Sequence, residues 1–190
     1  MDNPDQQLEQ FLQLHPDIEI FEVLLHDLNG TQRGKWLPRE QIDKLFKGGY
    51  KMPQTSCSLD SWGRDLEELV TATGDKDGVC RPHAGTLAPV PWADRPTGQI
   101  IVSMGDFTGE TPYEGDCRVA LENILKRFAK LGLTPVVASE MEFHLFELDR
   151  DQFGAPQHSQ KALDGSPALG GQTYGLDAMR DTAPLMDAIN

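Results

Sequence analysis

The sequence predicts an α+β fold, because strand-like runs and amphipathic helical segments occupy separate stretches of the chain. Apolar residues recur at helical spacing over residues 4–15 and 114–133. Two β-rich runs flank the turn signal Asn29-Gly30 within residues 18–38, which is typical of a hairpin. A further run over residues 98–107 has the continuous apolar sequence of a buried strand.

Two short helices are predicted around the hairpin. The first covers residues 4–15, and its apolar positions are Leu8, Phe11, Leu12 and Leu14. The second covers residues 39–49 and ends at Gly48-Gly49, because glycine commonly terminates helices. The order strand, strand, helix therefore follows the first helix.

The middle of the chain is harder to interpret. Residues 50–83 show no clear period, and a connection of that length is usually functional or mobile. Residues 85–92 and 98–107 return to strand-like composition, and we expect the first large domain to end near Pro112.

A new unit is expected from residue 113. Its helix over residues 114–133 has Asp116 as a candidate cap and Gly132 as a stop, and a strand is predicted over residues 134–147. A polar loop and a helical pattern over residues 176–190 complete the chain. These elements are too few to cover both faces of a sheet, so we expect a truncated domain.

Composition excludes some classes of partner. The formal net charge is −13, whereas nucleic-acid and anionic membrane surfaces require clustered Lys and Arg. No apolar run approaches the roughly 20 residues that cross a bilayer, and the polar, acidic start predicts no signal peptide. The three cysteines lack a CxxC pair, which favours a reducing cytoplasm over a disulfide framework or a structural zinc site. We expect a cytoplasmic protein that binds neither nucleic acid nor membrane.

Two acids share one face of the predicted strand over residues 134–147. Side chains alternate along a strand, so Glu140, Glu142 and His144 would lie on one side. Carboxylates at this spacing can share one divalent ion or bind two neighbouring ions, and oxygen ligands select Mg²⁺ or Mn²⁺. Such ions commonly clamp nucleotide phosphates. The alternative is a solvated strand face, which spacing alone does not separate from a metal site.

Three segments resemble the glutamine synthetase family. "VVASEMEFHLFELD" is similar to the Glu-x-Glu-Phe strand that opens the family's catalytic domain. "GTLAPVPWADRPTGQIIVSMGDFTGETPYEGDCR" resembles its linker-strand region, including an Asp-x-Arg at Asp116-Cys117-Arg118, and "HDLNGTQRGKWLP" resembles its amino-terminal hairpin. The order is that of the family across residues 18–190.

This resemblance implies an amino-terminal helix (1–17), a β-grasp-like domain (18–112) and the truncated beginning of the catalytic α/β barrel (113–190). Family members join the γ-carboxylate of glutamate to ammonia or an amine, with ATP, through γ-glutamyl phosphate. Glu140 and Glu142 would be ligands of the two divalent ions, Mg²⁺ or Mn²⁺, whereas no family ligand corresponds to His144. The intact protein would self-associate into stacked rings.

A second comparison with the family concerns the nucleophile, which is either ammonia or a larger amine. Glutamine-forming members carry an Asp-Gly-Ser-Ser-like loop that binds and deprotonates ammonium, and the matching stretch here is "YKMPQTSCSLDSWGRD". The aspartate position falls at Gln54 or Thr55, and a neutral side chain there weakens capture of a cation. The departure resembles the γ-glutamylamine branch, such as γ-glutamylputrescine synthetases. Asp60 replaces the aspartate if the alignment shifts, and Trp62 either contacts substrate or pins the loop.

Other residues have alternative interpretations. The acidic cluster of this region either attracts a polyamine or forms a solvated surface; its members are Asp60, Asp65, Glu67 and Glu68. Trp36 and Trp92 are expected to pack within the small domain. Three functions remain open at this point. These are a glutamate–amine ligase of nitrogen or polyamine metabolism, an ammonia-using glutamine synthetase, and a noncatalytic β-grasp interaction module. We expect this chain alone to be inactive.

Overall fold

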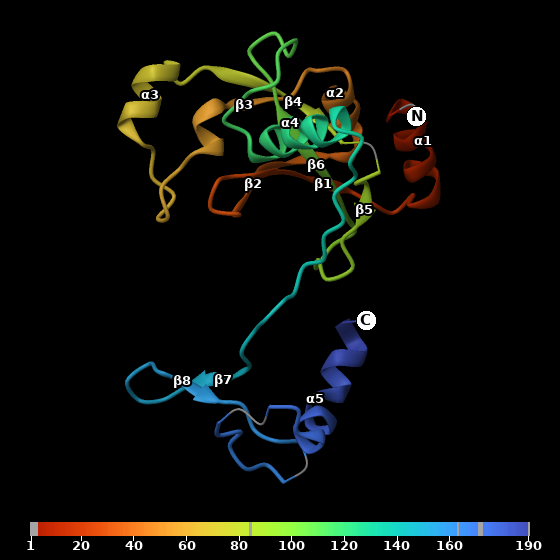
Figure 1. Cartoon of the computed structure of the whole chain (residues 1–190). Helices are drawn as coiled ribbons and strands as arrows, with labels where there is room; N and C mark the ends of the chain where they lie inside the picture. Colours follow the sequence, from red (N-terminus) through yellow and green to blue (C-terminus); the bar gives the residue numbers. More distant parts are fainter. Residues whose placement is uncertain (1–3, 84, 163, 171–172, 190) are drawn as a thin grey trace. The chain divides into compact units, whose positions relative to one another are not determined.

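The computed structural model describes residues 4–83, 85–162, 164–170 and 173–189. The predicted segments 1–17 and 176–190 therefore extend at their ends beyond the described residues. The chain divides into two compact units, Met1–Pro135 and Val136–Asn190 (Figure 1). The domain boundary expected near residue 112 stays a prediction.

The predicted start of the first unit is confirmed. Helix α1 covers Pro4–Leu14, and the hairpin strands are β1, Ile20–His26, and β2, Gln32–Pro38. They pair antiparallel from Ile20↔Pro38 to His26↔Gln32. A short 3₁₀ turn, η1 (Arg39–Gln41), then leads into helix α2 (Ile42–Phe46). Gly48 follows with a φ of 72°, a left-handed conformation that glycine adopts without steric cost.

Residues 50–83 contain regular structure that the sequence pattern did not reveal. They form strand β3 (Lys51–Pro53), the 3₁₀ helix η2 (Gln54–Cys57), helix α3 (Glu67–Thr73) and strand β4 (Asp77–Pro82). Each element has three to seven residues, too few to display a hydrophobic period. Strands β5 (Ala88–Pro89) and β6 (Thr97–Met104) confirm the two later strand predictions.

These strands form one mixed sheet with the order β2-β1-β6-β4-β3, and β5 pairs with β6 beside this path. The central pair β1 and β6 is parallel, with Ile20 opposite Thr97, whereas the other pairs are antiparallel. The mixed α/β character expected from the sequence is confirmed. The specific β-grasp description is not.

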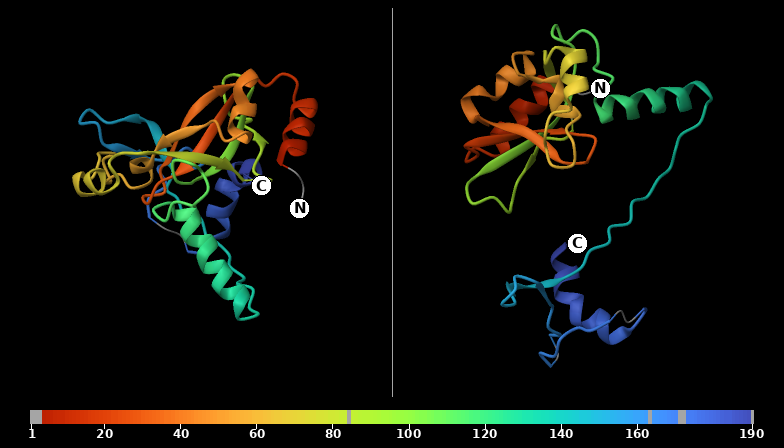
Figure 2. Two further views of the ribbon diagram at one scale, coloured as in Figure 1. Left: turned by 90° about the horizontal axis from the view of Figure 1, so that it is seen from above. Right: turned by 90° about the vertical axis from the view of Figure 1, so that its left-hand side faces the viewer.

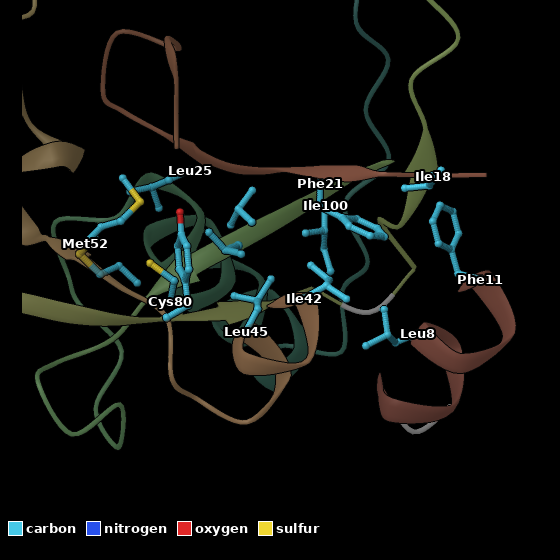
Figure 3. Packing of buried hydrophobic residues seen from close by; sticks show 14 of the residues in the cluster. Leu8, Phe11, Ile18, Phe21, Leu25, Ile42, Leu45, Met52, Cys80 and Ile100 are labelled. Carbon is cyan, nitrogen blue, oxygen red and sulfur yellow. The ribbon is translucent and has the colours of Figure 1, made fainter. Parts of the chain in front are cut away.

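A single apolar core lies against this sheet (Figure 3). Alternation along β1 buries Phe21, Val23 and Leu25 completely, as expected for a strand with one face on a core. Ile42 and Leu45 of α2 and Ile100 of β6 complete the centre of the cluster. The prediction for two tryptophans is wrong, because Trp36 is 64% exposed and Trp92 is 77% exposed.

Helix α4 (Cys117–Lys130) confirms the predicted helix and its cap. The Asp116 carboxylate accepts a hydrogen bond from Arg118 N, and Gly132 follows the helix with a φ of 69°. Figure 2 shows α4 projecting from the body of the first unit. Val119 is buried, whereas the helix's other large apolar side chains are largely exposed: Leu121, Ile124, Leu125 and Phe128.

The second unit contains strands β7 (Phe146–Arg150) and β8 (Pro156–His158) and helix α5 (Leu176–Ile189). Helix α5 confirms the helical pattern predicted from residue 176 and runs continuously through Pro184. The strand predicted over 134–147 is wrong for residues 134–145, which lie outside any described strand. A strand needs a neighbour for its backbone hydrogen bonds, and among the described residues none pairs with this segment.

Candidate functional site

The two predicted metal ligands lie in the extended segment that precedes β7. Glu140 and Glu142 are both exposed and belong to the second unit. No apolar layer covers the segment, since Val136 is 93% exposed and Met141 is 87% exposed. Both carboxylates are therefore accessible to a cation, although the alternating strand geometry that would aim them together is absent.

Carboxylate oxygens suit Mg²⁺ or Mn²⁺, so the donor chemistry of Glu140 and Glu142 fits the expected ions. A complete site needs more ligands than this pair. Among the residues that the structure describes, no three His, Cys, Asp or Glu side chains gather in a way that could hold a metal ion. The two carboxylates alone could supply only part of a coordination shell.

The residues at the expected aspartate position lie in η2 of the first unit. Thr55 is only 6% exposed, and its hydroxyl donates to Asp75 Oδ1 at 2.8 Å. Gln54 is half-buried, and its side-chain amide donates to Gly105 O at 3.5 Å. Both side chains thus make contacts within the unit, and Thr55 offers little surface to a substrate.

Asp60 organises the loop that follows η2. Its Oδ1 accepts hydrogen bonds from Trp62 N at 2.8 Å and from Arg64 N at 2.9 Å, and its Oδ2 pairs with Arg64 Nε at 2.8 Å. These hydrogen bonds, led by the one from the Arg64 backbone, hold the pKa of Asp60 below its usual range. The carboxylate is therefore ionised and engaged within its own loop.

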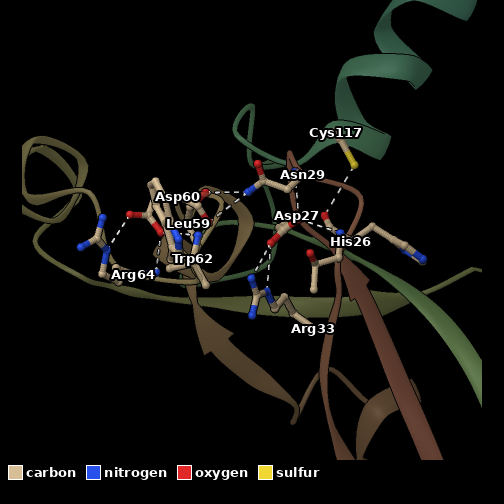
Figure 4. Close-up of polar contacts among 10 residues, drawn as sticks. His26, Asp27, Asn29, Arg33, Leu59, Asp60, Trp62, Arg64 and Cys117 are labelled. Carbon is tan, nitrogen blue, oxygen red and sulfur yellow. Dashed lines mark hydrogen bonds and ion pairs between the residues drawn. The ribbon is translucent and has the colours of Figure 1, made fainter. Parts of the chain in front are cut away.

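Trp62 is the exposed member of this loop. Its side chain is 79% accessible, and the Arg64 guanidinium lies 5.0 Å from the centre of its ring, within the range of a cation–π contact. Asp60 and Trp62 are thus brought together, with Asp60 fixing the backbone and Trp62 presenting a ring to the surroundings (Figure 4).

A buried ion pair beside this loop was missed by the sequence analysis. Asp27 is 1% exposed; its Oδ1 accepts from Asn29 N and Thr31 N, both at 2.9 Å, and its Oδ2 accepts from Arg33 Nε at 2.9 Å. Burial alone would raise the pKa of Asp27, but these hydrogen bonds and the Arg33 charge outweigh it and lower the pKa. The sequence did contain a signal for this contact, because Asp27 lies two residues before the Asn29-Gly30 turn, and an aspartate there can accept hydrogen bonds from the backbone of the turn.

A second polar cluster surrounds a cavity of 220 Å³ between β4, β6 and α4. His83 Nε2 lies 2.5 Å from Ser103 Oγ and 3.9 Å from Glu122 Oε1. Burial and the Arg118 charge lower the pKa of His83. The same nitrogen of His83, Nε2, faces both Ser103 and Glu122. In a Ser-His-Asp triad each of the two imidazole nitrogens faces one partner, so these three residues do not form such a triad.

The mixed sheet and the exposed acidic segment are compatible with the glutamine synthetase resemblance, and comparison with known proteins supports it. Residues 114–190 match the family model of the glutamine synthetase catalytic domain. The chain is 32% identical over 187 residues to gamma-glutamylputrescine synthetase PuuA of Escherichia coli (strain K12), covering 97% of this chain and 39% of the relative. A Methanosarcina mazei glutamine synthetase is 26% identical over 136 residues, or 70% of this chain and 28% of the relative.

Solved structures support the fold. Apo GmaS without ligand aligns with a TM-score of 0.58 at 21% identity, covering 94% of this chain and 37% of the other. Plasmodium falciparum glutamine synthetase aligns with a TM-score of 0.53 at 17% identity, covering 70% of this chain and 23% of the other. The 32% identity to PuuA over 97% of the chain shows that the chain belongs to the glutamine synthetase family, which confirms the predicted resemblance. The chain spans about two fifths of the length of PuuA.

In the described part of the chain, no helix has both the length and the apolar character that a membrane span requires.

Proposed function

We propose that the protein to which this chain contributes is an ATP-dependent ligase that joins the γ-carboxylate of glutamate to an amine through γ-glutamyl phosphate. The 32% identity to gamma-glutamylputrescine synthetase over 97% of the chain carries this proposal. It favours an alkyl amine or polyamine over ammonia. The neutral Gln54 and Thr55 at the expected aspartate position support the same choice, because capture of ammonium benefits from a negative charge.

In this proposal Glu140 and Glu142 bind Mg²⁺ or Mn²⁺ together with ligands from elsewhere in the protein. The bound ions would neutralise charge on the phosphates of ATP. The two glutamates contribute accessible anionic oxygens to the metal site. As a separate part of the proposal, the exposed ring of Trp62 is available to contact the amine. Asp60 contributes by ordering the loop, since both of its oxygens already accept hydrogen bonds.

Further proposals on fold, assembly and location accompany this function. We propose a β-grasp-like first domain over residues 18–112, a catalytic domain beginning at residue 113, self-association into rings and a cytoplasmic location. The three cysteines are free thiols in the structure, which suits a reducing compartment. Inactivity of the 190-residue chain alone stays a prediction.

Release of ADP by the full-length protein, with glutamate and Mg²⁺, tests the reaction. Putrescine is expected to support turnover with a higher kcat/KM than ammonium. The ammonia-using alternative, favoured by the 26% identity to a glutamine synthetase, predicts the reverse order. No ADP release with putrescine, with ammonium or with a panel of other alkyl amines and polyamines would refute ligase activity and favour a noncatalytic interaction module. The same assay on the 190-residue chain tests its expected inactivity.

Metal binding is tested separately from turnover. Loss of one carboxylate ligand should weaken Mn²⁺ binding by about tenfold or more, so Glu140→Gln and Glu142→Gln should raise the Mn²⁺ dissociation constant measured by electron paramagnetic resonance. Glu9→Gln, the same change at an exposed position of α1, is the matched control. Unchanged Mn²⁺ affinity in both variants would remove these glutamates from the site.

A further inference from the structure

The β1–β2 turn is fastened to the loop of residues 57–64 through backbone and side-chain contacts. Leu28 N donates to Cys57 O at 3.0 Å. The Asn29 side-chain amide donates to Leu59 O at 2.8 Å and to Asp60 O at 3.3 Å (Figure 4). Segments about 30 residues apart in sequence are therefore joined where the loop begins.

The turn that makes these contacts is itself cross-linked by hydrogen bonds. Asp27 lies on β1's side of the turn and binds the backbone of Asn29 and Thr31 and the side chain of Arg33, which lies on β2. A buried carboxylate with this many donors is costly to displace, because its charge would lose its partners. The turn can therefore act as a fixed support.

Arg33 also lies near the far end of the loop. An added Cβ at Gly63 would stand 3.5 Å from both terminal nitrogens of the Arg33 guanidinium. Gly63 has a φ of 79°, a conformation that side chains rarely adopt. The β1–β2 turn thus holds the loop at Cys57 and at Leu59 and Asp60, before Trp62, and the Arg33 guanidinium lies near Gly63, after it.

We propose that the β1–β2 turn positions the loop that carries Trp62, with Asn29 as the positioning residue. Asn29 fixes the backbone carbonyls of Leu59 and Asp60, and the Asp60 carboxylate then holds Trp62 N. The exposed indole ring consequently has a defined location. The consequence for an amine substrate rests on the proposed function, whereas the fastening of the loop does not.

The test is Asn29→Asp, which preserves side-chain shape and removes both amide donors. Asn123→Asp, the same change at an exposed position of α4, is the matched control. Trypsin cleavage after Arg64 in the native full-length protein should become about tenfold faster in Asn29→Asp, since a lost hydrogen bond shifts local opening by roughly that factor. Asn29→Ala, which cannot repel the two carbonyls, should accelerate cleavage in the same direction.

A spectroscopic reading is independent of the protease. With Trp36 and Trp92 replaced by Phe, Trp62 is the one remaining tryptophan of this chain. Its fluorescence anisotropy should fall in Asn29→Asp and stay unchanged in Asn123→Asp. Equal cleavage and equal anisotropy in wild type and both Asn29 variants would overturn the fastening of the loop.

Steady-state kinetics of the full-length protein test the positioning role. Asn29→Asp should raise the KM for the amine several-fold while the KM for ATP stays unchanged, a split that general destabilisation would not produce. Faster loop opening without any change in amine KM would overturn positioning for substrate. If wild type turns over no amine, the proposed function fails, and cleavage with anisotropy still decides whether Asn29 holds the loop.

Discussion

Replacing Asp116 should reveal how α4 is attached to the sheet. Asp116 is 1% exposed; its Oδ1 accepts from Arg118 N at 2.8 Å and its Oδ2 accepts from Met104 N at 2.7 Å. Asp116→Ala removes a helix cap, worth about 1 kcal/mol, and leaves a buried N–H without its partner, which costs about 1 to 3 kcal/mol. We therefore expect a loss of about 2 to 4 kcal/mol.

Asp116→Asn separates the two contributions. Asparagine caps helices as well as aspartate does, but its amide group would face Met104 N–H once its oxygen accepts from Arg118 N. The loss should be about 1 kcal/mol smaller than for alanine, because the cap survives. Asp94→Ala, at an exposed acidic position, serves as the control.

Urea unfolding followed by tryptophan fluorescence is a suitable assay. Every tryptophan of the chain lies in the first unit, at positions 36, 62 and 92, so the signal reports on this unit. An Asp116→Ala protein within about 0.5 kcal/mol of wild type would refute the reasoning, since that is the range of ordinary surface substitutions. Equal losses for alanine and asparagine would show that the cap contributes nothing.

Three further outcomes are expected. Arg39 donates to Leu12 O, His15 O and Ile18 O, so Arg39→Met should accelerate amide exchange in α1 by about tenfold, and unchanged exchange would contradict this anchoring role. The pKa of Asp27 in the folded protein is below its ordinary value of 3.8, so the ionised carboxylate stabilises the fold above pH 3.8, and this stabilisation is lost as the pH falls through the lower folded pKa. The urea midpoints of wild type and Asp27→Asn should therefore converge below pH 3.8. A gap between them that stays constant with pH would refute this linkage. Burial raises the pKa of Cys80 to about 12 and also raises that of Cys57, so a thiol reagent at about pH 8 should label Cys117 first, and Cys117→Ser should abolish the fast phase.

The sequence was most informative where a period or a turn signal was long enough to be recognised. The hairpin around Asn29-Gly30 and the helix capped by Asp116 have the predicted type and place. Helix α3 and strand β4 were missed because neither is long enough to show a distinct period. The alternation of polar and apolar residues over 134–145 predicted a strand, but no strand forms there. Such alternation shows which side chains would share a face, and it does not show whether another strand is present to pair with the backbone.

In the candidate site too, local features were predictable from the sequence and contacts between distant segments were not. Residue chemistry and family resemblance selected Glu140, Glu142 and Trp62, all of which are exposed. Sequence could not show that Thr55 already has a partner, because its hydroxyl is hydrogen-bonded to Asp75, 20 positions away. The partners of the Asp60 carboxylate are local, but the attachment of its loop to the distant β1–β2 turn was not visible in the sequence. Hydrogen bonds between remote segments depend on the tertiary fold and leave no local period.

The parallel pairing of β1 with β6 has a consequence for biosynthesis. Ile20 pairs with Pro38 within the hairpin, but its second neighbour, Thr97, lies on β6, so the middle of the sheet cannot close until β6 has left the ribosome. Until then the edge of β1 that will pair with β6 has free backbone N–H and C=O groups, and this nascent intermediate is exposed to aggregation and to chaperones. Slower translation before residue 97 would prolong that interval, whereas the finished protein would be unchanged.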